Sequence, residues 1–323
     1  KSKIMKKIYI LCFLIFIFKC NAQFTLIPDS NFEQLLVTQN IDTDGVVDGQ
    51  VATVDIADET NLVINNTMIQ NLTGIEGFTS LEHLELYNNE HLYQLNVSQN
   101  LLLKVFYCVG SNINIFNFTN NIALEDLYLQ SNFISQLNIT NNINLTSLYC
   151  QSCGLNTLDI SNNVNLTMLQ CGFNDLTSLD VSNNLLLELL WIGWNNISAI
   201  NLSSNTLLRD FSSAYNSFVT IDLSNNLLLE KFSCFNNNQI TDLSFVNNPL
   251  LTRVYCNNNI NLSTINIQNG ANNLLNGTVS NGNIPETFSN RFSAINNPNL
   301  YCIFVVDVVN CNANWLGIDA ISN

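Results

Sequence analysis

Charge is scarce in this 323-residue chain. Asp, Glu, Lys and Arg together make up 11% of its residues, against roughly 25% in an average soluble protein. Only 10 residues are Lys or Arg, and the formal net charge is -15. Nucleic acids and anionic membranes bind proteins through clustered cations, so the sequence argues against both as partners. Acidity of this kind also keeps an extracellular protein soluble.

Histidines and long apolar runs are scarce as well. The chain has only two histidines, His83 and His91, and no Ser-His-Asp or Cys-His arrangement can be assembled around them. No separate non-repeat domain of about 100 residues is present to hold another kind of catalytic site. We therefore expect no enzyme. Beyond the N-terminal segment no apolar run is long enough to cross a bilayer, so no membrane span is expected in the mature chain.

The first 22 residues have the features of a signal peptide. Lys6 and Lys7 form a basic start, residues 8–18 form an apolar run, and Ala22 offers a small residue for cleavage. This pattern predicts a secreted or cell-surface protein that is cleaved near Ala22. A lipoprotein with its lipid on Cys20 is the alternative.

A repeat of 21 or 22 residues fills the middle of the chain. In each unit apolar residues recur at the first, fourth, sixth, eleventh, fourteenth and sixteenth places. The nine units open at Leu81, Leu103, Leu124, Leu145, Leu166, Leu187, Leu208, Leu229 and Leu251. One unit cannot bury its leucines alone, so successive units must stack as coils and share a core. The pattern resembles the leucine-rich-repeat signature L-x-x-L-x-L-x-x-N/C-x-L. It predicts an all-β-dominated, right-handed leucine-rich-repeat solenoid with a parallel sheet on its concave face and few or no convex helices.

Asparagine recurs in two further rows. The ninth place holds Asn89, Asn132, Asn174, Asn195, Asn216, Asn237 and Asn259. The nineteenth place, or its equivalent in the longer units, holds Asn100, Asn121, Asn142, Asn163, Asn184, Asn205, Asn226 and Asn248. Carboxamides can both donate to and accept from the backbone of the turns. We expect two buried structural ladders.

The ends of the array need caps that cover the terminal coils. Pro28-Asp29-Ser30 begins a predicted capping helix over residues 30–39, with Phe32 and Leu36 on its apolar stripe. The predicted organisation is a signal peptide at 1–22, an N-terminal cap with degenerate repeats at 23–80, nine repeats at 81–273 and an irregular C-terminal cap at 274–323.

The chain resembles secreted leucine-rich-repeat proteins of Bacteroidetes-type bacteria and, more loosely, internalin-type adhesins. The resemblance is carried by residues 27–33, the recurring Leu-Asp-Val/Ile-Ser-Asn-Asn, and residues 297–302 with 313–315. It covers most of the mature chain and implies an extracellular binding role.

Cysteines and acidic residues are the remaining candidates for special chemistry. Five cysteines occupy the sixth place, a core position where a thiol acts as a small apolar group: Cys108, Cys150, Cys171, Cys234 and Cys256. Cys302 and Cys311 lie outside the array of an exported chain, and we predict a disulfide between them.

An acidic stretch near the N-terminus is a weak candidate for calcium. Asp42, Asp44 and Asp48 combine three carboxylates with turn glycines, which suits a hard cation. An EF-hand would need a glutamate where Thr53 stands, so the alternative is an acidic turn without metal. No other cofactor is expected.

Aromatic residues gather at places that face out of the predicted sheet, since side chains alternate along a strand. The predicted ligand-binding residues are Tyr107, Tyr128, Tyr149, Phe173, Trp191, Trp194, Tyr215 and Tyr255. Exposed aromatic patches mark interaction sites, so the sequence predicts a protein-binding or adhesion scaffold. The alternatives are carbohydrate binding, a purely structural envelope role, and aromatics that only cover a sheet that favours them.

Overall fold

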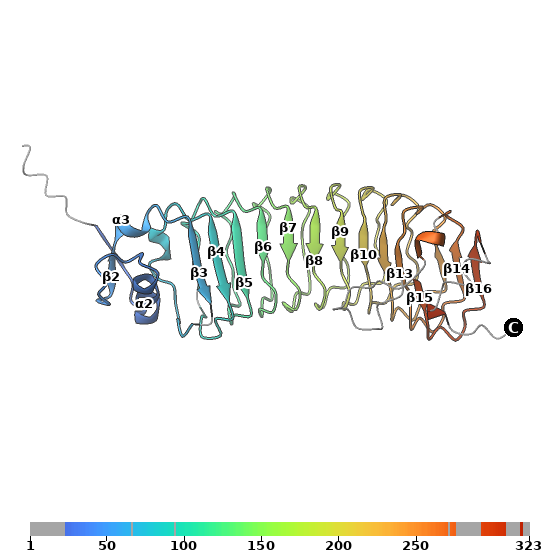
Figure 1. Cartoon of the computed structure of the whole chain (residues 1–323), viewed down its shortest axis with the longest axis horizontal. Coiled ribbons are helices and arrows are strands. Elements are labelled where there is room, and N and C mark those ends of the chain that lie inside the picture. Colours follow the sequence, from blue (N-terminus) through green and yellow to red (C-terminus); the bar gives the residue numbers. More distant parts are fainter. Residues whose placement is uncertain are drawn as a thin grey trace, which may run out of the picture.

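The chain forms one elongated stack of coils in a computed structural model that describes residues 23–65, 67–93, 95–270, 272–275, 292–307 and 317–318 (Figure 1). The predicted signal peptide with its cleavage point at Ala22, and Cys311 of the predicted disulfide, lie outside the described residues. No helix in the described part of the chain is long and apolar enough to cross a membrane.

One parallel sheet of twelve strands runs the length of the stack (Figure 1). In chain order the strands are β3 (Asn61–Asn65), β4 (His83–Tyr87), β5 (Val105–Val109), β6 (Asp126–Tyr128), β7 (Ser147–Tyr149), β8 (Met168–Gln170), β9 (Leu189–Trp191), β10 (Asp210–Ser212), β11 (Lys231–Ser233), β13 (Arg253–Tyr255), β15 (Phe292–Ala294) and β17 (Gly317–Ile318). The register pairs equal places of neighbouring units, as in Leu127 with Leu148 and Leu148 with Leu169. The predicted parallel sheet with one strand per coil is therefore confirmed.

The opposite side of the stack is built from turns and short extended segments. From residue 95 to residue 270 the described chain contains no helix, which confirms the expected absence of convex helices there. Only the last coils form a second parallel sheet on this side, of β12 (Asp242–Ser244), β14 (Thr264–Ile267) and β16 (Cys302–Val305). A short 3-10 helix, η2 (Asn272–Leu275), follows β14.

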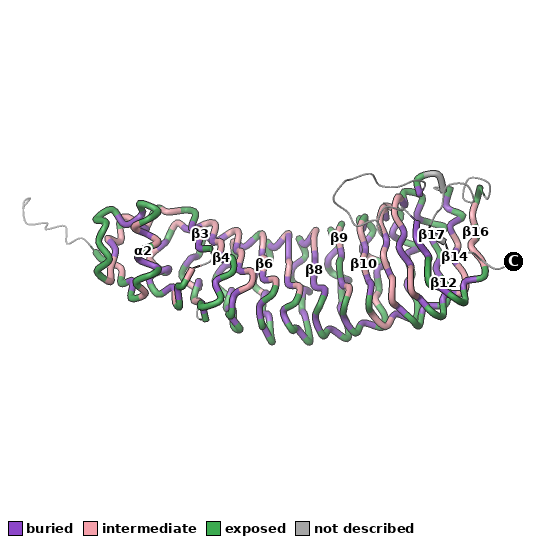
Figure 2. The backbone as a smooth tube through the Cα atoms, turned by 60° about the horizontal axis from the view of Figure 1, so that its bottom comes forward, coloured by how far each residue is buried: buried purple, intermediate pink, exposed green. Residues whose placement is uncertain are grey.

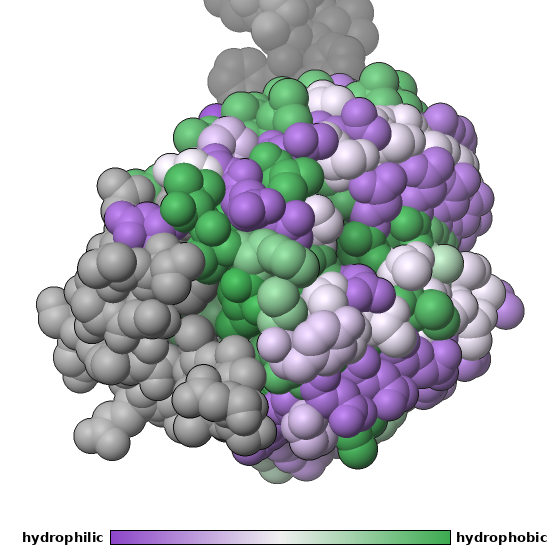
Figure 3. All heavy atoms as spheres, turned by 90° about the vertical axis from the view of Figure 1, so that its right-hand side faces the viewer, coloured by the Kyte–Doolittle hydropathy of each residue, from purple (hydrophilic) through white to green (hydrophobic). Residues whose placement is uncertain are grey.

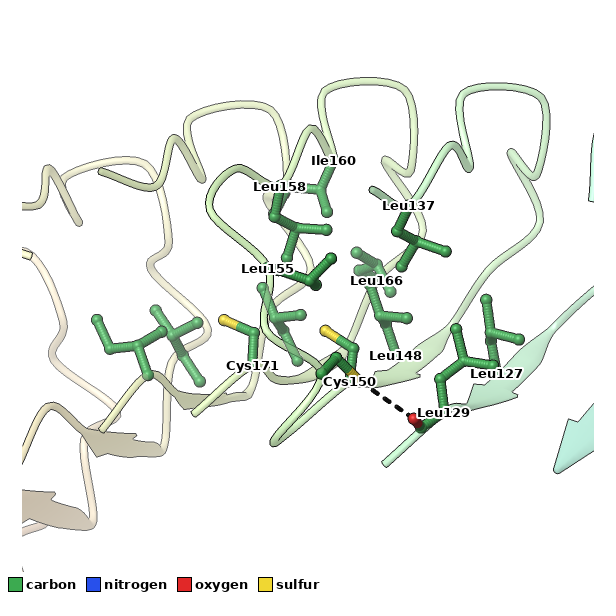
Figure 4. Packing of buried hydrophobic residues seen from close by; sticks show 14 of the residues in the cluster. Leu127, Leu129, Leu137, Leu148, Cys150, Leu155, Leu158, Ile160, Leu166 and Cys171 are labelled. Carbon is green, nitrogen blue, oxygen red and sulfur yellow. Dashed lines mark hydrogen bonds between the residues drawn. The ribbon is translucent and has the colours of Figure 1, made fainter. Parts of the chain in front are cut away.

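The apolar residues of successive coils, mostly Leu, Ile and Phe, form one continuous core. Buried and exposed stretches alternate along each coil (Figure 2). Leu148, Leu155 and Leu166 are fully buried and point toward one another inside the coils (Figure 4). The sixth-place cysteines Cys150 and Cys171 lie in this core and are fully buried too. Each coil hides its apolar residues only because a neighbour covers them, as the repeat requires.

Both asparagine ladders form, but the second one only donates, because the Oδ1 atoms of its members accept no hydrogen bond within the described residues. In the second ladder, the Asn184 Nδ2 donates to the carbonyl oxygens of Ile160 at 3.1 Å and Asn163 at 2.8 Å. In the ninth-place ladder, the Asn195 Nδ2 donates to Ile192 O at 3.0 Å, and its Oδ1 accepts from Leu176 N at 3.0 Å. These carboxamides satisfy backbone groups that the turns leave inside the stack, so they hold adjacent coils together.

The predicted capping helix is present as α2 (Ser30–Thr38). The Asp29 carboxylate accepts from Asn31 N at 3.0 Å and Phe32 N at 3.3 Å, which satisfies free N–H groups of the first turn. Phe32 is buried and stacks near Phe78 at a centroid distance of 6.4 Å. The helix thus covers the first degenerate coil.

The rest of the cap is held on α2 by a buried carboxylate. Glu33 is 1% exposed and accepts from the backbone N–H groups of Asp48, Gly49 and Gln50 at 2.9 to 3.1 Å. These residues lead into β2 (Gln50–Ala52), which pairs antiparallel with β1 (Phe24–Leu26). The short helix α3 (Thr53–Ile56) follows, and the 3-10 helix η1 (Ile75–Gly77) belongs to the next coil.

The C-terminal end of the stack has a mixed surface. Seen along the long axis, hydrophobic and hydrophilic residues alternate in patches over its described part (Figure 3). The last described coil exposes Phe304 at 45% and Tyr301 at 68%. Cys302 begins β16 and is half-buried. The disulfide to Cys311 stays a prediction.

Candidate binding face

Fifth-place residues form one row on the outward face of the main sheet. The register places Tyr107 beside Tyr128 and Tyr128 beside Tyr149, and the row continues through Gln170 to Trp191. The apolar residues on either side of each of these positions are fully buried. The structure therefore brings the predicted tyrosines together on one surface.

The three tyrosines form a stack along the array. Ring centroids are 3.9 Å apart for Tyr107 and Tyr128 and 4.5 Å apart for Tyr128 and Tyr149, with interplanar angles of 7° and 14°. His83 extends the stack at 5.8 Å from Tyr107. All three tyrosines are half-buried. Partial burial and hydrogen bonding to Tyr107 raise the pKa of Tyr128, so this phenol stays neutral at physiological pH.

A second aromatic stack lies at the eighth place, just beyond the ends of the strands. Phe173 and Trp194 have centroids 5.0 Å apart, and Trp194 and Tyr215 have centroids 3.6 Å apart, with interplanar angles of 13° and 18°. Their exposed fractions are 54%, 44% and 37%. We call these three residues the trailing stack, because they lie on the margin of the sheet where the strands end.

The backbone of the trailing stack is left-handed. The φ angles of Phe173, Trp194 and Tyr215 are +56°, +59° and +53°. Other coils place small or polar residues at the same φ-positive position, namely Asn88, Gly110, Ser131, Ser152, Asn236 and Asn258. For a bulky side chain this region is a genuine outlier that costs on the order of 1–3 kcal/mol per residue. The aromatic residues therefore stand here against the preference of the backbone.

Small residues precede the trailing stack at the seventh place. A Cβ on Gly172 would lie 2.7 Å from the Gly193 carbonyl oxygen, and a Cβ on Gly193 would lie 3.0 Å from the Ala214 carbonyl oxygen. The backbones of these coils thus approach too closely for larger side chains. This close approach lets the three rings reach stacking distance.

A shallow hollow opens beside the trailing stack. Besides the three rings it is lined by polar residues of the same turns, including Asp175, Asn196, Ser217 and Asn236. A larger hollow lies among the N-terminal coils, next to Tyr93 and Ile115. That one brings no two of the predicted binding residues together, so we place the candidate site at the stacks.

Trp191 stands apart from both stacks. It is 40% exposed, and its Nε1 donates to Asp210 Oδ1 at 3.0 Å. Within the described residues no other ring lies in stacking contact with it. Ser212 and Ser233 follow it along the row and leave a small hollow that Trp191 and Tyr255 flank.

Tyr255 corrects the predicted face. It is only 7% exposed, although it has the same place in the row as the half-buried Tyr107, Tyr128 and Tyr149. Its strand, β13, pairs with β11 on one side and with β15 on the other. The Arg253 guanidinium lies 5.8 Å from the Tyr255 ring centroid. Tyr255 therefore contributes a buried wall to the hollow and not an open contact surface.

The cations of the described chain gather at the same end. Three of its four Lys and Arg residues lie on β10, β11 and β13 or directly before them, namely Arg209, Lys231 and Arg253, and Lys104 is the fourth. Arg209 pairs with Glu230 at 2.6 Å and Lys231 with Asp210 at 3.3 Å. The grouping was not predicted, although the sequence shows these cations at the second or third place of three consecutive units.

Within the described residues, Asp42, Asp44 and Asp48 do not form a group that could hold a metal ion. Asp42 is 3% exposed, and its Oδ2 accepts no hydrogen bond within the described residues. The Asp44 carboxylate accepts from Val46 N at 2.8 Å within its own turn. In the described ranges no group of three Asp, Glu, His or Cys side chains could hold a metal ion. Calcium binding by Asp42, Asp44 and Asp48 stays a prediction.

Burial, followed by repulsion from Asp44, raises the pKa of Asp42 to about 6. A raised pKa means that the folded cap prefers the protonated acid, so stability present below about pH 4 is lost as pH rises through 6. Asp42→Asn keeps the neutral form at every pH. We expect the melting temperature of the variant to exceed that of the wild type at pH 7 and to match it near pH 4. Equal melting temperatures at both pH values would contradict this role of Asp42.

The fold is that of known leucine-rich-repeat proteins. An internalin, InlF, from Listeria monocytogenes superimposes with a TM-score of 0.64 at 18% identity, covering 92% of this chain and 96% of that one. The functional domain of InlJ from the same species, which includes a cysteine ladder, gives 0.55 at 21% identity over 88% and 71%. Internalin C2 gives 0.56 at 21% identity over 64% and 96%. No protein-family model and no curated protein matches the chain.

Proposed function

We propose that this chain is an extracellular binding scaffold that holds a protein partner at the trailing stack and the adjoining outward face of the main sheet. One observation carries the proposal. Three bulky aromatic residues occupy left-handed backbone positions in consecutive coils, where other coils use Asn, Ser or Gly. Being 37% to 54% exposed, they do not fill the core. Strain that packing does not explain is typical of functional sites.

The stacking geometry favours a protein over a carbohydrate. Sugars bind aromatic residues through an open ring face, but in both stacks the near-parallel rings cover one another's faces. What the inner rings offer to a ligand is mainly their edges. Edge contacts suit the apolar and aromatic side chains of a protein interface. Trp191, with no ring stacked on it among the described residues, is the position that best suits a sugar.

The test exchanges the trailing stack for residues that other coils carry at the same place. The triple variant Phe173→Ser, Trp194→Asn, Tyr215→Asn keeps the positive φ angles. It places there the residue types that tolerate them in the other coils. We expect its melting temperature to equal or exceed that of the wild type, because the exchange relieves the backbone cost of the bulky side chains. Binding to a panel of purified extracellular proteins, measured by surface plasmon resonance, should fall at least tenfold for every partner found. That loss is the size expected when hot-spot aromatic residues are removed.

The matched control changes exposed apolar residues elsewhere. Phe133→Ser with Val219→Asn alters side chains that are 78% and 48% exposed and that lie outside both stacks. Its binding should equal that of the wild type. Unchanged binding by the trailing-stack variant would reject the site. Ligands on a glycan array that Trp191→Ala abolishes, with no protein partner, would favour carbohydrate recognition instead. No ligand of either kind would favour a structural envelope role.

A further inference from the structure

A row of exposed aliphatic side chains runs along the opposite margin of the sheet, where the strands begin. Each member directly follows a buried asparagine of the second ladder. The row, which we call the leading ridge, contains Leu101, Ile122, Ile143, Val164, Leu185 and Leu227. Their exposed fractions lie between 47% and 59%. Thr206 is the one interruption between Leu101 and Leu227.

The regularity of the leading ridge needs an explanation outside the coil itself. Single exposed leucines are normal on any protein surface, but contiguous apolar patches mark interaction sites. The next residue along the chain widens the ridge in several coils, as Leu102, Leu186 and Leu207 are 49%, 42% and 37% exposed. At about 4.8 Å per coil, the six steps from Leu101 to Leu227 span about 29 Å.

Charge is absent from the leading ridge but flanks it in an ordered row. The second place of the same coils carries Lys104, Glu125, Thr146, Thr167, Glu188, Arg209 and Glu230, each 21 residues after the last. Thr167 is the midpoint of this row. If a second copy of the row is laid against it in the opposite direction about Thr167, Lys104 faces Glu230 and Glu125 faces Arg209. The row is thus complementary to itself when antiparallel.

We infer that the leading ridge binds a second copy of this chain in an antiparallel, two-fold arrangement centred near Val164. A two-fold interface uses one patch on both subunits, so the patch must be complementary to itself. The leading ridge and the charged row beside it both meet that condition. It also lets two chains of net charge -15 meet along an uncharged strip. An anionic membrane surface would instead repel such a chain. The inference is independent of the proposed function, because the trailing stack lies on the other margin.

Sedimentation equilibrium tests the leading ridge. The wild type should dimerise at micromolar concentration. Ile143→Asp with Leu185→Asp, close to the two-fold centre, should raise the dimer dissociation constant at least tenfold with little change in melting temperature. The control Ile115→Asp with Val219→Asp changes residues that are 74% and 48% exposed and lie off the ridge, so it should dimerise like the wild type.

Charge reversal tests the antiparallel register. Lys104→Glu should weaken the dimer, and adding Glu230→Lys in the same chain should restore it. Within one chain the two positions are six coils apart, so restoration reports a contact between chains. A wild type that stays monomeric at 100 µM would overturn the inference. Undiminished dimerisation of the Ile143→Asp, Leu185→Asp variant would also overturn it, as would a second reversal that fails to restore the dimer. Flotation of a monomeric wild type with phosphatidylcholine vesicles would show that the ridge binds lipid instead.

Discussion

Asn184→Asp is expected to lower the free energy of unfolding by about 3–5 kcal/mol at pH 7, the cost of a buried charge without a partner. Asparagine and aspartate have the same shape, but the Asn184 Nδ2 donates to two carbonyl oxygens, at 3.1 Å and 2.8 Å. A carboxylate at this fully buried position would face those oxygens with no proton to give. Urea denaturation followed by circular dichroism measures the difference.

The neighbouring asparagine provides the control. The Asn183 Nδ2 donates to Ser161 O at 3.2 Å, but its side chain is exposed. Asn183→Asp should therefore change stability by no more than about 0.5 kcal/mol. The defect of Asn184→Asp should also shrink as pH falls, because the protonated acid regains a donor. Equal stabilities of the two variants at pH 7 would show that the ladder contributes little.

The sixth-place thiols are expected to resist labelling until the array unfolds. Burial raises the pKa of Cys171 from its ordinary value of 9.0 to about 12. At pH 8 this alone lowers the thiolate fraction about a thousandfold, and the thiolate is the reactive form. Iodoacetamide labelling followed by peptide mass spectrometry should find Cys171, Cys234 and Cys256 protected in the native protein and modified in urea.

Cys302 serves as the internal comparison for that experiment. It is half-buried at the start of β16, not enclosed between coils. As a free thiol it should be labelled in the native protein well before Cys171. If the predicted disulfide to Cys311 is present, Cys302 should react only after reduction. Native labelling of Cys171 at the rate found in urea would contradict a closed core.

Repetition made the fold predictable. Each unit repeats the same six apolar places, so a place misassigned in one unit is corrected by comparison with the other eight. The asparagine ladders were predictable for a related reason, since a polar residue recurring among buried leucines must satisfy the backbone. The capping helix followed from Asp29 and the stripe of Phe32 and Leu36, which are local signals.

The candidate site was predictable as a set of residues but not as a geometry. The alternation of side chains along a strand placed Tyr107 and Trp191 on the outward face. It does not show which rings stack. The left-handed eighth place does have a signal in the sequence, since Asn, Ser and Gly fill it in the other coils. The prediction did not use this signal. The burial of Tyr255 depends on β15, which comes from residues 292–294, beyond the last repeat.

The leading ridge was not predicted from the sequence, for a different reason. Its signal is visible as the recurring aliphatic residue after Asn-Asn, as in residues 183–187. A periodic leucine pattern does not distinguish a leucine that enters the core from its neighbour that remains outside. Leu187 is fully buried and Leu185 is 52% exposed. Only the path of the turn separates them.

The left-handed eighth place has a consequence for how such a chain can change over evolutionary time. Its side chain lies outside the core, so six coils carry small or polar residues there and three carry aromatic rings on the same backbone. A single codon change can therefore add or remove one contact without disturbing the stack. Paralogues with the same coils could acquire different partners by moving the rings to other turns. Binding specificity would then change faster in evolution than the fold.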